Sequence, residues 1–179
     1  MISKTTIIIP ALKNSPILDN TLKHCLELKT NPDIIIVTDD NTNHTYHDQN
    51  NIEYMVVKPG MTMSKKRNIA VQKCKSKYVA FFDSDSFPAN QDWIISAISN
   101  LKKDEKIYAV GGPDTSPPFE EVSQKNVGLL KKSFLISGFR NHRKNILNEM
   151  YVPELSSCNL FMEREKYLEL DGIDENLYT

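Results

Sequence analysis

Two aspartates separated by one residue are the feature of this sequence best suited to chemistry. Asp83-Ser84-Asp85 follows directly after the apolar run 78–82. Alternate residues of an extended segment point the same way, so both carboxylates can face one site. Two unpaired carboxylates about 4 Å apart repel by roughly 4 kcal/mol at an effective dielectric of about 20. A hard divalent cation relieves this repulsion, and diphosphate oxygens can complete its coordination shell.

The same residues have a structural alternative, in which Asp85 or Ser86 caps the helix that follows. Their position after a predicted buried strand favours the metal site, because ligands of open α/β sheets bind beyond the carboxyl ends of the strands. Polar residues also follow two other predicted strands. They are Pro10-Ala11-Leu12-Lys13-Asn14 after the first strand and Thr38-Asp39-Asp40-Asn41 after the second. We therefore expect three loops to converge on one edge of the sheet.

Three consecutive basic residues, Lys65, Lys66 and Arg67, stand at the start of a predicted helix. The N-terminal end of this helix is expected to approach the same sheet edge. A helix N-terminus together with a guanidinium suits a phosphate or an anionic base edge. We expect Arg67 to contact such a ligand, and Lys65 and Lys66 to lie on a solvated face.

The elements that must position these residues are short apolar runs that alternate with segments of helical period. The runs are residues 6–9, 34–37, 52–57, 78–82 and 107–110. Short runs that are β-branched and apolar on both faces are typical of parallel strands covered by helices on each side. Three helices are predicted between them, capped by Ser15, Ser64 and Asn90. This order predicts an α/β fold with a Rossmann-like, doubly wound, mostly parallel sheet flanked by helices.

The alternation breaks after Gly111-Gly112. Residues 119–145 form a mixed helical stretch that ends in the basic and aromatic cluster 139–144, which is a candidate contact for an anionic or lipid-linked partner. A last strand is expected at about 157–162, followed by a short helix that stops near Gly172. The sequence has no internal repeat or long linker, so a single domain over 1–179 is predicted.

Composition narrows the classes of partner and location. The net charge is −1, so bulk electrostatics predicts neither nucleic acid nor an anionic membrane as partner. Three widely spaced cysteines, Cys25, Cys74 and Cys158, are expected to be reduced core thiols. No signal-peptide pattern is present, and no apolar run approaches the ~20 residues needed to cross a bilayer. We expect a cytoplasmic protein without a transmembrane segment, which leaves a peripheral association with a membrane open.

Six short segments, in order along the chain, carry a family resemblance. They are Ile7-Ile8-Ile9-Pro10, Val37-Thr38-Asp39-Asp40-Asn41, Lys66-Arg67-Asn68-Ile69-Ala70, the run 78–85, Asn159-Leu160-Phe161-Met162-Glu163-Arg164 and Gly172-Ile173-Asp174-Glu175. With these segments in register, the sequence resembles the family 2 glycosyltransferases from Thr5 to the last residue. The resemblance implies a GT-A fold, a nucleotide-diphosphate sugar donor that is most often a UDP-sugar, and Mn²⁺ or Mg²⁺ as cofactor.

The resemblance also implies roles on the base side of the donor. Pro10 and Ala11 would line the base pocket through their backbone. Asp40 would bind the uracil edge, and Arg67 would lie near the base or the phosphates.

On the phosphate side, the resemblance places Ser84 in the donor-binding segment between the two aspartates. Asp83 would contact the ribose or the water shell of the metal, and Asp85 would ligate the metal directly. Family members transfer the sugar to a saccharide or lipid-linked acceptor with inversion, while a carboxylate takes the proton of the acceptor hydroxyl.

Two departures from the family pattern bear on these roles. The carboxylate base of the family usually lies in an E-D pair a few residues beyond the segment matched by Gly172 to Glu175, so it is expected beyond Thr179. Within the single domain, we expect 1–112 to bind the nucleotide sugar and 113–179 to begin an acceptor-side part that is truncated. The loop after the first strand reads Leu12-Lys13-Asn14 in place of the family's frequent aromatic-asparagine pair.

Other classes of protein fit the motifs less well. A haloacid-dehalogenase-type phosphatase could use Asp83 and Asp85, but it would have Thr or Val where Phe87 stands. Sugar nucleotidyltransferases and dinucleotide-binding domains carry a glycine-rich loop after the first strand, which is absent here. The alternative outside the enzymes is a fragment that binds the donor and a metal but transfers nothing.

Overall fold

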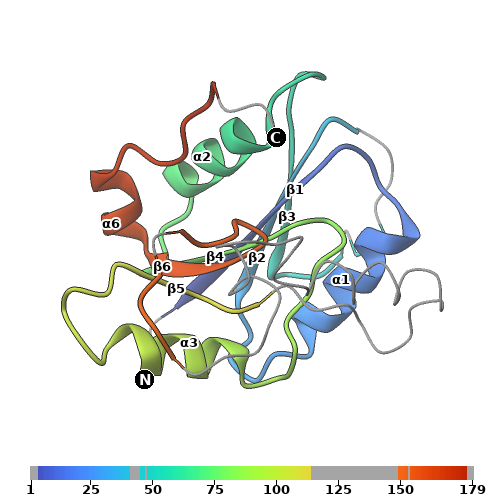
Figure 1. The fold of residues 1–179 in the computed structure, drawn as a ribbon. Coiled ribbons are helices and arrows are strands. Elements are labelled where there is room, and N and C mark those ends of the chain that lie inside the picture. The colour runs from blue at the N-terminus through green and yellow to red at the C-terminus, as the bar shows by residue number, and fades with distance from the viewer. Residues whose placement is uncertain (1–3, 41–44, 47, 114–148, 153, 177–179) are drawn as a thin grey trace, which may run out of the picture.

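A mixed six-stranded sheet forms the centre of the protein (Figure 1). The computed structural model describes residues 4–40, 45–46, 48–113, 149–152 and 154–176. The strands are β1 (Thr5–Ala11), β2 (Asp33–Thr38), β3 (Ile52–Val56), β4 (Tyr78–Phe82), β5 (Ala109–Gly111) and β6 (Asn159–Glu163). The helices are α1 (Pro16–Leu26), α2 (Met63–Lys73), α3 (Trp93–Leu101) and α6 (Arg164–Glu169).

The strand order is β3-β2-β1-β4-β6-β5, with the first four of these strands parallel. Strand β6 runs antiparallel to both of its neighbours, β4 and β5. The predicted α/β class and the mostly parallel sheet are therefore confirmed. The reversed direction of β6 was not predicted, because the apolar pattern of a buried strand is the same in both directions.

The two faces of the sheet are covered by different helices, α1 and α3 on one side and α2 and α6 on the other (Figure 1). Neighbouring residues of β1 divide between these layers, because successive strand residues point to opposite faces. Ile7 and Ile9 belong to the core under α1 and α3, and Ile8 belongs to the core under α2 and α6. All three side chains are fully buried, as expected for a strand covered on both sides.

Only one of the three predicted helix caps is correct. Ser15 caps α1, where its Oγ accepts a hydrogen bond from the backbone N–H of Leu18 at 3.2 Å. Helix α2 begins earlier than predicted, at a cap formed by Thr62, and Ser64 lies buried in its first turn. Helix α3 begins after Asp92, while the predicted cap Asn90 accepts the N–H of Asp92 in the preceding turn. Two short polar residues stand near the start of each of these helices, and the sequence does not show which of them is the cap.

Some predictions concern residues that the structure does not describe or places differently. Strand β5 is shorter than predicted, and Ile107 lies before it, packed against the core. The helical stretch 119–145 and the cluster 139–144 lie outside the described residues. The cysteines agree with the expectation of thiols, since Cys25 and Cys74 are buried and Cys158 is half-buried.

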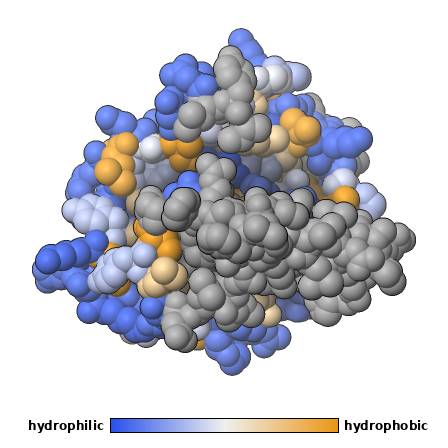
Figure 2. All heavy atoms as spheres, viewed as in Figure 1, coloured by the Kyte–Doolittle hydropathy of each residue, from blue (hydrophilic) through white to orange (hydrophobic). Residues whose placement is uncertain are grey.

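The surface of the described part is mostly hydrophilic on the face seen in Figure 2, where exposed hydrophobic residues form separate spots. The described helices include none with the length and apolar character needed to span a membrane.

Candidate functional site

Three loops meet at one edge of the sheet, as the sequence predicts. The paired register brings Ala11 beside Thr38 at the ends of β1 and β2, and Ile8 beside Phe81 in β4. Two hydrogen bonds join separate segments of the chain at this edge. The backbone N–H of Asn14 donates to Asp40 Oδ2 at 3.1 Å, which links the loops after β1 and β2. The hydroxyl of Thr21, on α1, donates to the carbonyl oxygen of Ser84 at 3.0 Å.

The segment after β4 forms a tight turn that exposes Asp85. The hydroxyl of Ser86 accepts the N–H of Asp83 at 2.7 Å and lies 3.1 Å from the carbonyl oxygen of Cys158. The N–H of Ser86 donates to the carbonyl oxygen of Asp83 at 3.1 Å, which closes the turn. Helix α3 starts only at Trp93. The alternative in which Asp85 or Ser86 caps this helix is therefore wrong, and Ser86 instead stabilises the turn that carries the two aspartates.

Arg67 reaches the same turn from α2. Its guanidinium forms an ion pair with Asp83 through NH2 and Oδ1. Only 4% of Arg67 is exposed, whereas 43% of the Asp83 side chain is exposed. Among the described residues, Nε of Arg67 has no hydrogen-bond acceptor. The structure thus brings together two of the predicted site residues from different elements, on the side of the sheet covered by α2.

The expectation of a solvated face for Lys66 is wrong, because its side chain is completely buried. Its ammonium donates to the carbonyl oxygen of Ala11 at 2.7 Å and lies 2.6 Å from Asp39 Oδ1. A buried lysine requires such partners, since an unpaired charge in the interior is strongly unfavourable. The helical spacing from Lys66 to the apolar Ala70 was the sequence feature that could have placed Lys66 on the inner face. The side chain of Lys65 is half-exposed, which agrees better with the expected solvated face.

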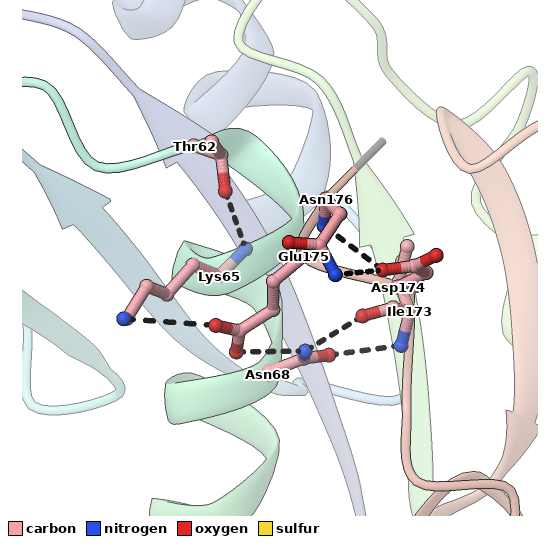
Figure 3. Close-up of polar contacts among 7 residues, drawn as sticks. All are labelled: Thr62, Lys65, Asn68, Ile173, Asp174, Glu175 and Asn176. Carbon is pink, nitrogen blue, oxygen red and sulfur yellow. Dashed lines mark hydrogen bonds and ion pairs between the residues drawn. The ribbon is translucent and has the colours of Figure 1, made fainter. Parts of the chain in front are cut away.

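Asn68 is a further buried polar residue of α2, and its importance was not predicted (Figure 3). Its Nδ2 donates to the carbonyl oxygen of Ile173 at 2.9 Å and to Glu175 Oε1 at 3.1 Å. Its Oδ1 accepts the N–H of Ile173 at 3.0 Å and the hydroxyl of Tyr167 at 2.5 Å. Lys65 Nζ adds an ion pair with Glu175 Oε2 at 3.6 Å. One amide group therefore fastens the C-terminal segment 172–175 to α2.

The side chains of Asn68 and Tyr167 leave no room for a larger residue at Gly172. Its φ is +75°, and a Cβ built there would lie 2.5 Å from Oδ1 of Asn68. Burial also raises the pKa of Tyr167 to about 12, so its hydroxyl remains a hydrogen-bond donor even above about pH 10, where an ordinary tyrosine ionises. The Gly172-Ile173-Asp174-Glu175 segment thus has a local physical reason for its glycine.

An open pocket of about 390 Å³ lies across the N-terminal turn of α2. Residues 58–62 and Lys65 line one side, and Glu175 and Asn176 line the other. Neither Asp83 nor Asp85 lines it.

The aspartates could hold a metal only with help from another molecule. The described part of the chain contains no cluster of three or more His, Cys, Asp or Glu side chains placed to bind a metal ion. A hard divalent cation takes six or more oxygen ligands, so two carboxylates leave most of its shell to other oxygens. The residues therefore fit a cation that arrives with an oxygen-rich ligand, such as a diphosphate.

Comparison with known proteins identifies the family. The model of glycosyl transferase family 2 matches residues 6–167. The chain belongs to glycosyl transferase family 2. Over 115 residues it is 31% identical to chondroitin synthase of Pasteurella multocida (strain Pm70), an alignment that covers 59% of this chain and 12% of that protein. Because the chain belongs to this family, the alternative of a haloacid-dehalogenase-type phosphatase is wrong.

Solved structures agree on the fold of this family 2 chain. The mannosyltransferase PcManGT from Pyrobaculum calidifontis, in complex with GDP-Man and Mn²⁺, matches 98% of the chain with a TM-score of 0.67 and 15% identity. Residues 1–349 of S. aureus TarS, in complex with UDP, match 97% with a TM-score of 0.66 and 18% identity. The expected GT-A fold is therefore confirmed. The chain spans 48% and 51% of these two structures, and much less of chondroitin synthase.

Proposed function

We propose that this family 2 chain forms the donor side of a metal-dependent glycosyltransferase. It would bind a nucleotide-diphosphate sugar with Mn²⁺ or Mg²⁺ and transfer the sugar, with inversion, to a saccharide or lipid-linked acceptor. The observation that carries the proposal is the turn after β4. This turn exposes Asp85 beside an Asp83 that is held by the buried Arg67.

The two aspartates would have different tasks because their surroundings differ. Asp85 is exposed at the tip of the turn, where its carboxylate can ligate a cation directly. One oxygen of Asp83 is engaged by Arg67, which suits a contact with the ribose or the water shell of the metal. Ser84, between the two aspartates, would belong to the same donor-binding segment. The bound metal would stabilise the negative charge that develops on the departing diphosphate.

The base of the nucleotide would lie over the ends of β1 and β2. Pro10 and Ala11 would line its pocket through their backbone, and Asp40, half-buried between the two loops, would bind the edge of the base. A mannosyltransferase complex with GDP-Man and TarS complexes with UDP and UDP-GlcNAc support a nucleotide-sugar donor. We propose a UDP-sugar, the donor that the family resemblance implies most often.

The general base is assigned to no described residue. The two acids of the C-terminal segment already have partners. Glu175 contacts Asn68 and Lys65, and Asp174 accepts the backbone N–H of Asn176 at 2.9 Å (Figure 3). The described residues therefore support donor binding more directly than transfer.

Calorimetric titration of UDP and GDP, with Mn²⁺ and then with EDTA, tests the donor site. We expect one nucleotide to bind, with an affinity that Mn²⁺ increases. Asp85→Ala should reduce the Mn²⁺-dependent gain by about tenfold or more, since it removes a direct ligand. Its thermal unfolding should stay close to that of the wild type, because the side chain is exposed.

Asp174→Ala is the matched control, an exposed carboxylate outside the proposed site whose loss should leave the gain unchanged. A folded Asp85→Ala variant that keeps the full Mn²⁺-dependent gain would refute the metal assignment. A donor-binding fragment without transferase activity would show the same binding but release no nucleotide from the sugar donor in the presence of acceptors.

A further inference from the structure

The ammonium of Lys66 connects two loops from inside the protein. It donates to the carbonyl oxygen of Ala11, the last residue of β1, at 2.7 Å. It also lies 2.6 Å from the carboxylate of Asp39, the first residue after β2. The Lys66 side chain is completely buried, and 13% of the Asp39 side chain is exposed. The pair therefore lies beneath the sheet edge where the base pocket is proposed.

We infer that Lys66 is a positioning residue of the nucleotide site, one that fixes the loops after β1 and β2 at the separation required by the base. This inference rests on the proposed function. Ala11 would contribute backbone to the base pocket, and Asp40, next to Asp39 in the chain, would bind the edge of the base. Lys66 itself would not touch the nucleotide.

The surroundings of Lys66 argue against a role in stability alone. An apolar side chain of similar volume would fill a buried position at equal or lower cost, because a buried ion pair must first be stripped of water. The other two lysines of α2 have half-exposed side chains, 50% for Lys65 and 53% for Lys73. A buried ammonium with a hydrogen bond to Ala11 and an ion pair with Asp39 instead specifies a geometry. Ala11 ends β1 and Asp39 follows β2, so both partners lie where the site loops begin.

A second contact crosses the same two loops nearer to the solvent. The N–H of Asn14 donates to Asp40 Oδ2 at 3.1 Å. The buried contact of Lys66 and the partly buried contact of Asn14 thus both hold the two loops together. Loss of the contact made by Lys66 should let the base pocket change shape.

The contacts of Arg67, the next residue on α2, show that the role of Lys66 can be tested separately from the metal site. Successive residues of an α-helix are rotated by about 100°, so Lys66 and Arg67 reach different strand ends. Lys66 contacts the ends of β1 and β2, whereas Arg67 contacts Asp83 after β4. A change at Lys66 should therefore weaken recognition of the base and leave the metal-dependent contribution intact.

The test measures these two contributions separately. Titration of UMP or GMP in EDTA, whichever nucleotide the wild type prefers, reports the base side. The ratio of UDP or GDP affinities with Mn²⁺ and with EDTA reports the metal side. Lys66→Met should weaken monophosphate binding by about tenfold, the effect of losing one well-formed polar contact, and leave the Mn²⁺ ratio unchanged. Asp85→Ala should show the opposite pattern.

Lys66→Met leaves Asp39 without its cation and can impair folding. A double variant, Lys66→Met with Asp39→Asn, removes both charges of the pair. It should regain most of the thermal stability, because neither partner is left charged and buried. It should not regain the affinity for the monophosphate, because the link to the Ala11 carbonyl is still missing. Lys73→Met, a change of a half-exposed lysine on the same helix, is the matched control and should bind as the wild type does.

If the wild type binds a nucleotide, three results would overturn the inference alone. Binding of the monophosphate by the double variant within about twofold of wild type would assign Lys66 to stability alone. An equal loss of monophosphate affinity and of the Mn²⁺ ratio would mean collapse of the whole site. A double variant that does not fold would assign the pair to folding. Wild type that binds neither UDP nor GDP would instead refute the proposed function, and the inference with it.

Discussion

Three consecutive side chains of α2 contact three separate parts of the candidate site. Lys66 contacts the loops after β1 and β2, Arg67 contacts the turn after β4, and Asn68 contacts the C-terminal segment. All three are buried, although each is polar or charged. Each directed contact restricts the position of one segment, so the positions of the proposed base and metal ligands depend on these single residues.

At the residue scale, Tyr167 gives a prediction about pH. Its pKa is raised to about 12 by burial, whereas an exposed tyrosine in an unfolded chain titrates near 10. A raised pKa in the folded state stabilises the fold fully below about pH 10 and loses this effect as pH rises toward about 12. The unfolding free energy of the wild type relative to Tyr167→Phe should therefore fall by about 1 kcal/mol between about pH 8 and about pH 11.

Urea unfolding of both proteins across this pH range measures the difference. A difference that does not change with pH would show that Tyr167 titrates as an exposed tyrosine does.

The residues of the site were predictable from sequence only in part. Asp83, Asp85 and Arg67 were expected at one edge because carboxyl ends of parallel strands meet there, and the structure pairs Arg67 with Asp83. Lys66 was expected in solvent, since a lysine at the start of a helix usually lies there. Its burial depends on Asp39 from a loop 27 positions earlier in the chain (66 − 39). Sequence gives no distance between such residues.

At the scale of elements, α2 and the C-terminal segment form one unit that depends on backbone shape at Gly172. Asn68 satisfies both of its polar atoms on this segment and on Tyr167, as Figure 3 shows for the segment. The close approach of the Asn68 side chain to this segment is possible because Gly172 has no side chain and adopts a φ of +75°. The position of Glu175 beside Lys65 follows from this contact.

Gly172→Ala should destabilise the protein by about 2–3 kcal/mol, through an unfavourable φ and a clash with Asn68. Gly60→Ala is the matched control, since Gly60 also has a positive φ, +86°, but no atom lies within 4 Å of a Cβ built there. The control should therefore lose only about 1 kcal/mol. Urea unfolding measures both, and equal losses would show that the contact with Asn68 is loose.

The elements themselves were predicted more accurately than their ends. The bounds of β4 agree with the predicted run because five consecutive apolar residues mark a strand buried on both faces. The caps of α2 and α3 were wrong because Thr62 and Asp92 compete with Ser64 and Asn90 for the same task. A cap is decided by backbone dihedrals, which composition does not determine.

At the scale of the whole molecule, the two ends of the described chain share one sheet. Strand β6 lies between β4 and β5, although it follows them in sequence. Its Phe161 is fully buried, stacks on Tyr78 with ring centroids 5.3 Å apart and contacts Trp93 edge-on at 6.0 Å. The core therefore includes residues from both parts of the expected division into 1–112 and 113–179.

A fragment of residues 1–112 should therefore fail to fold cooperatively. Without β6, one edge of β4 is left unpaired and the core lacks Phe161. Trp93 is the single tryptophan and packs on Phe82 at 4.9 Å, so its fluorescence follows the core during urea titration. The full chain should give a sigmoidal transition and the fragment a gradual change. A sharp transition in the fragment would contradict this account of the sheet.

The pairing of Lys66 with Asp39 also constrains how the sequence can diverge. Replacement of either residue alone leaves the other charge buried or nearly buried without its partner. A single replacement at either position should therefore destabilise the protein. Joint replacement by neutral residues removes that penalty. We therefore expect the two positions to vary together among descendants of this gene, as an epistatic pair in which the effect of one substitution depends on the other.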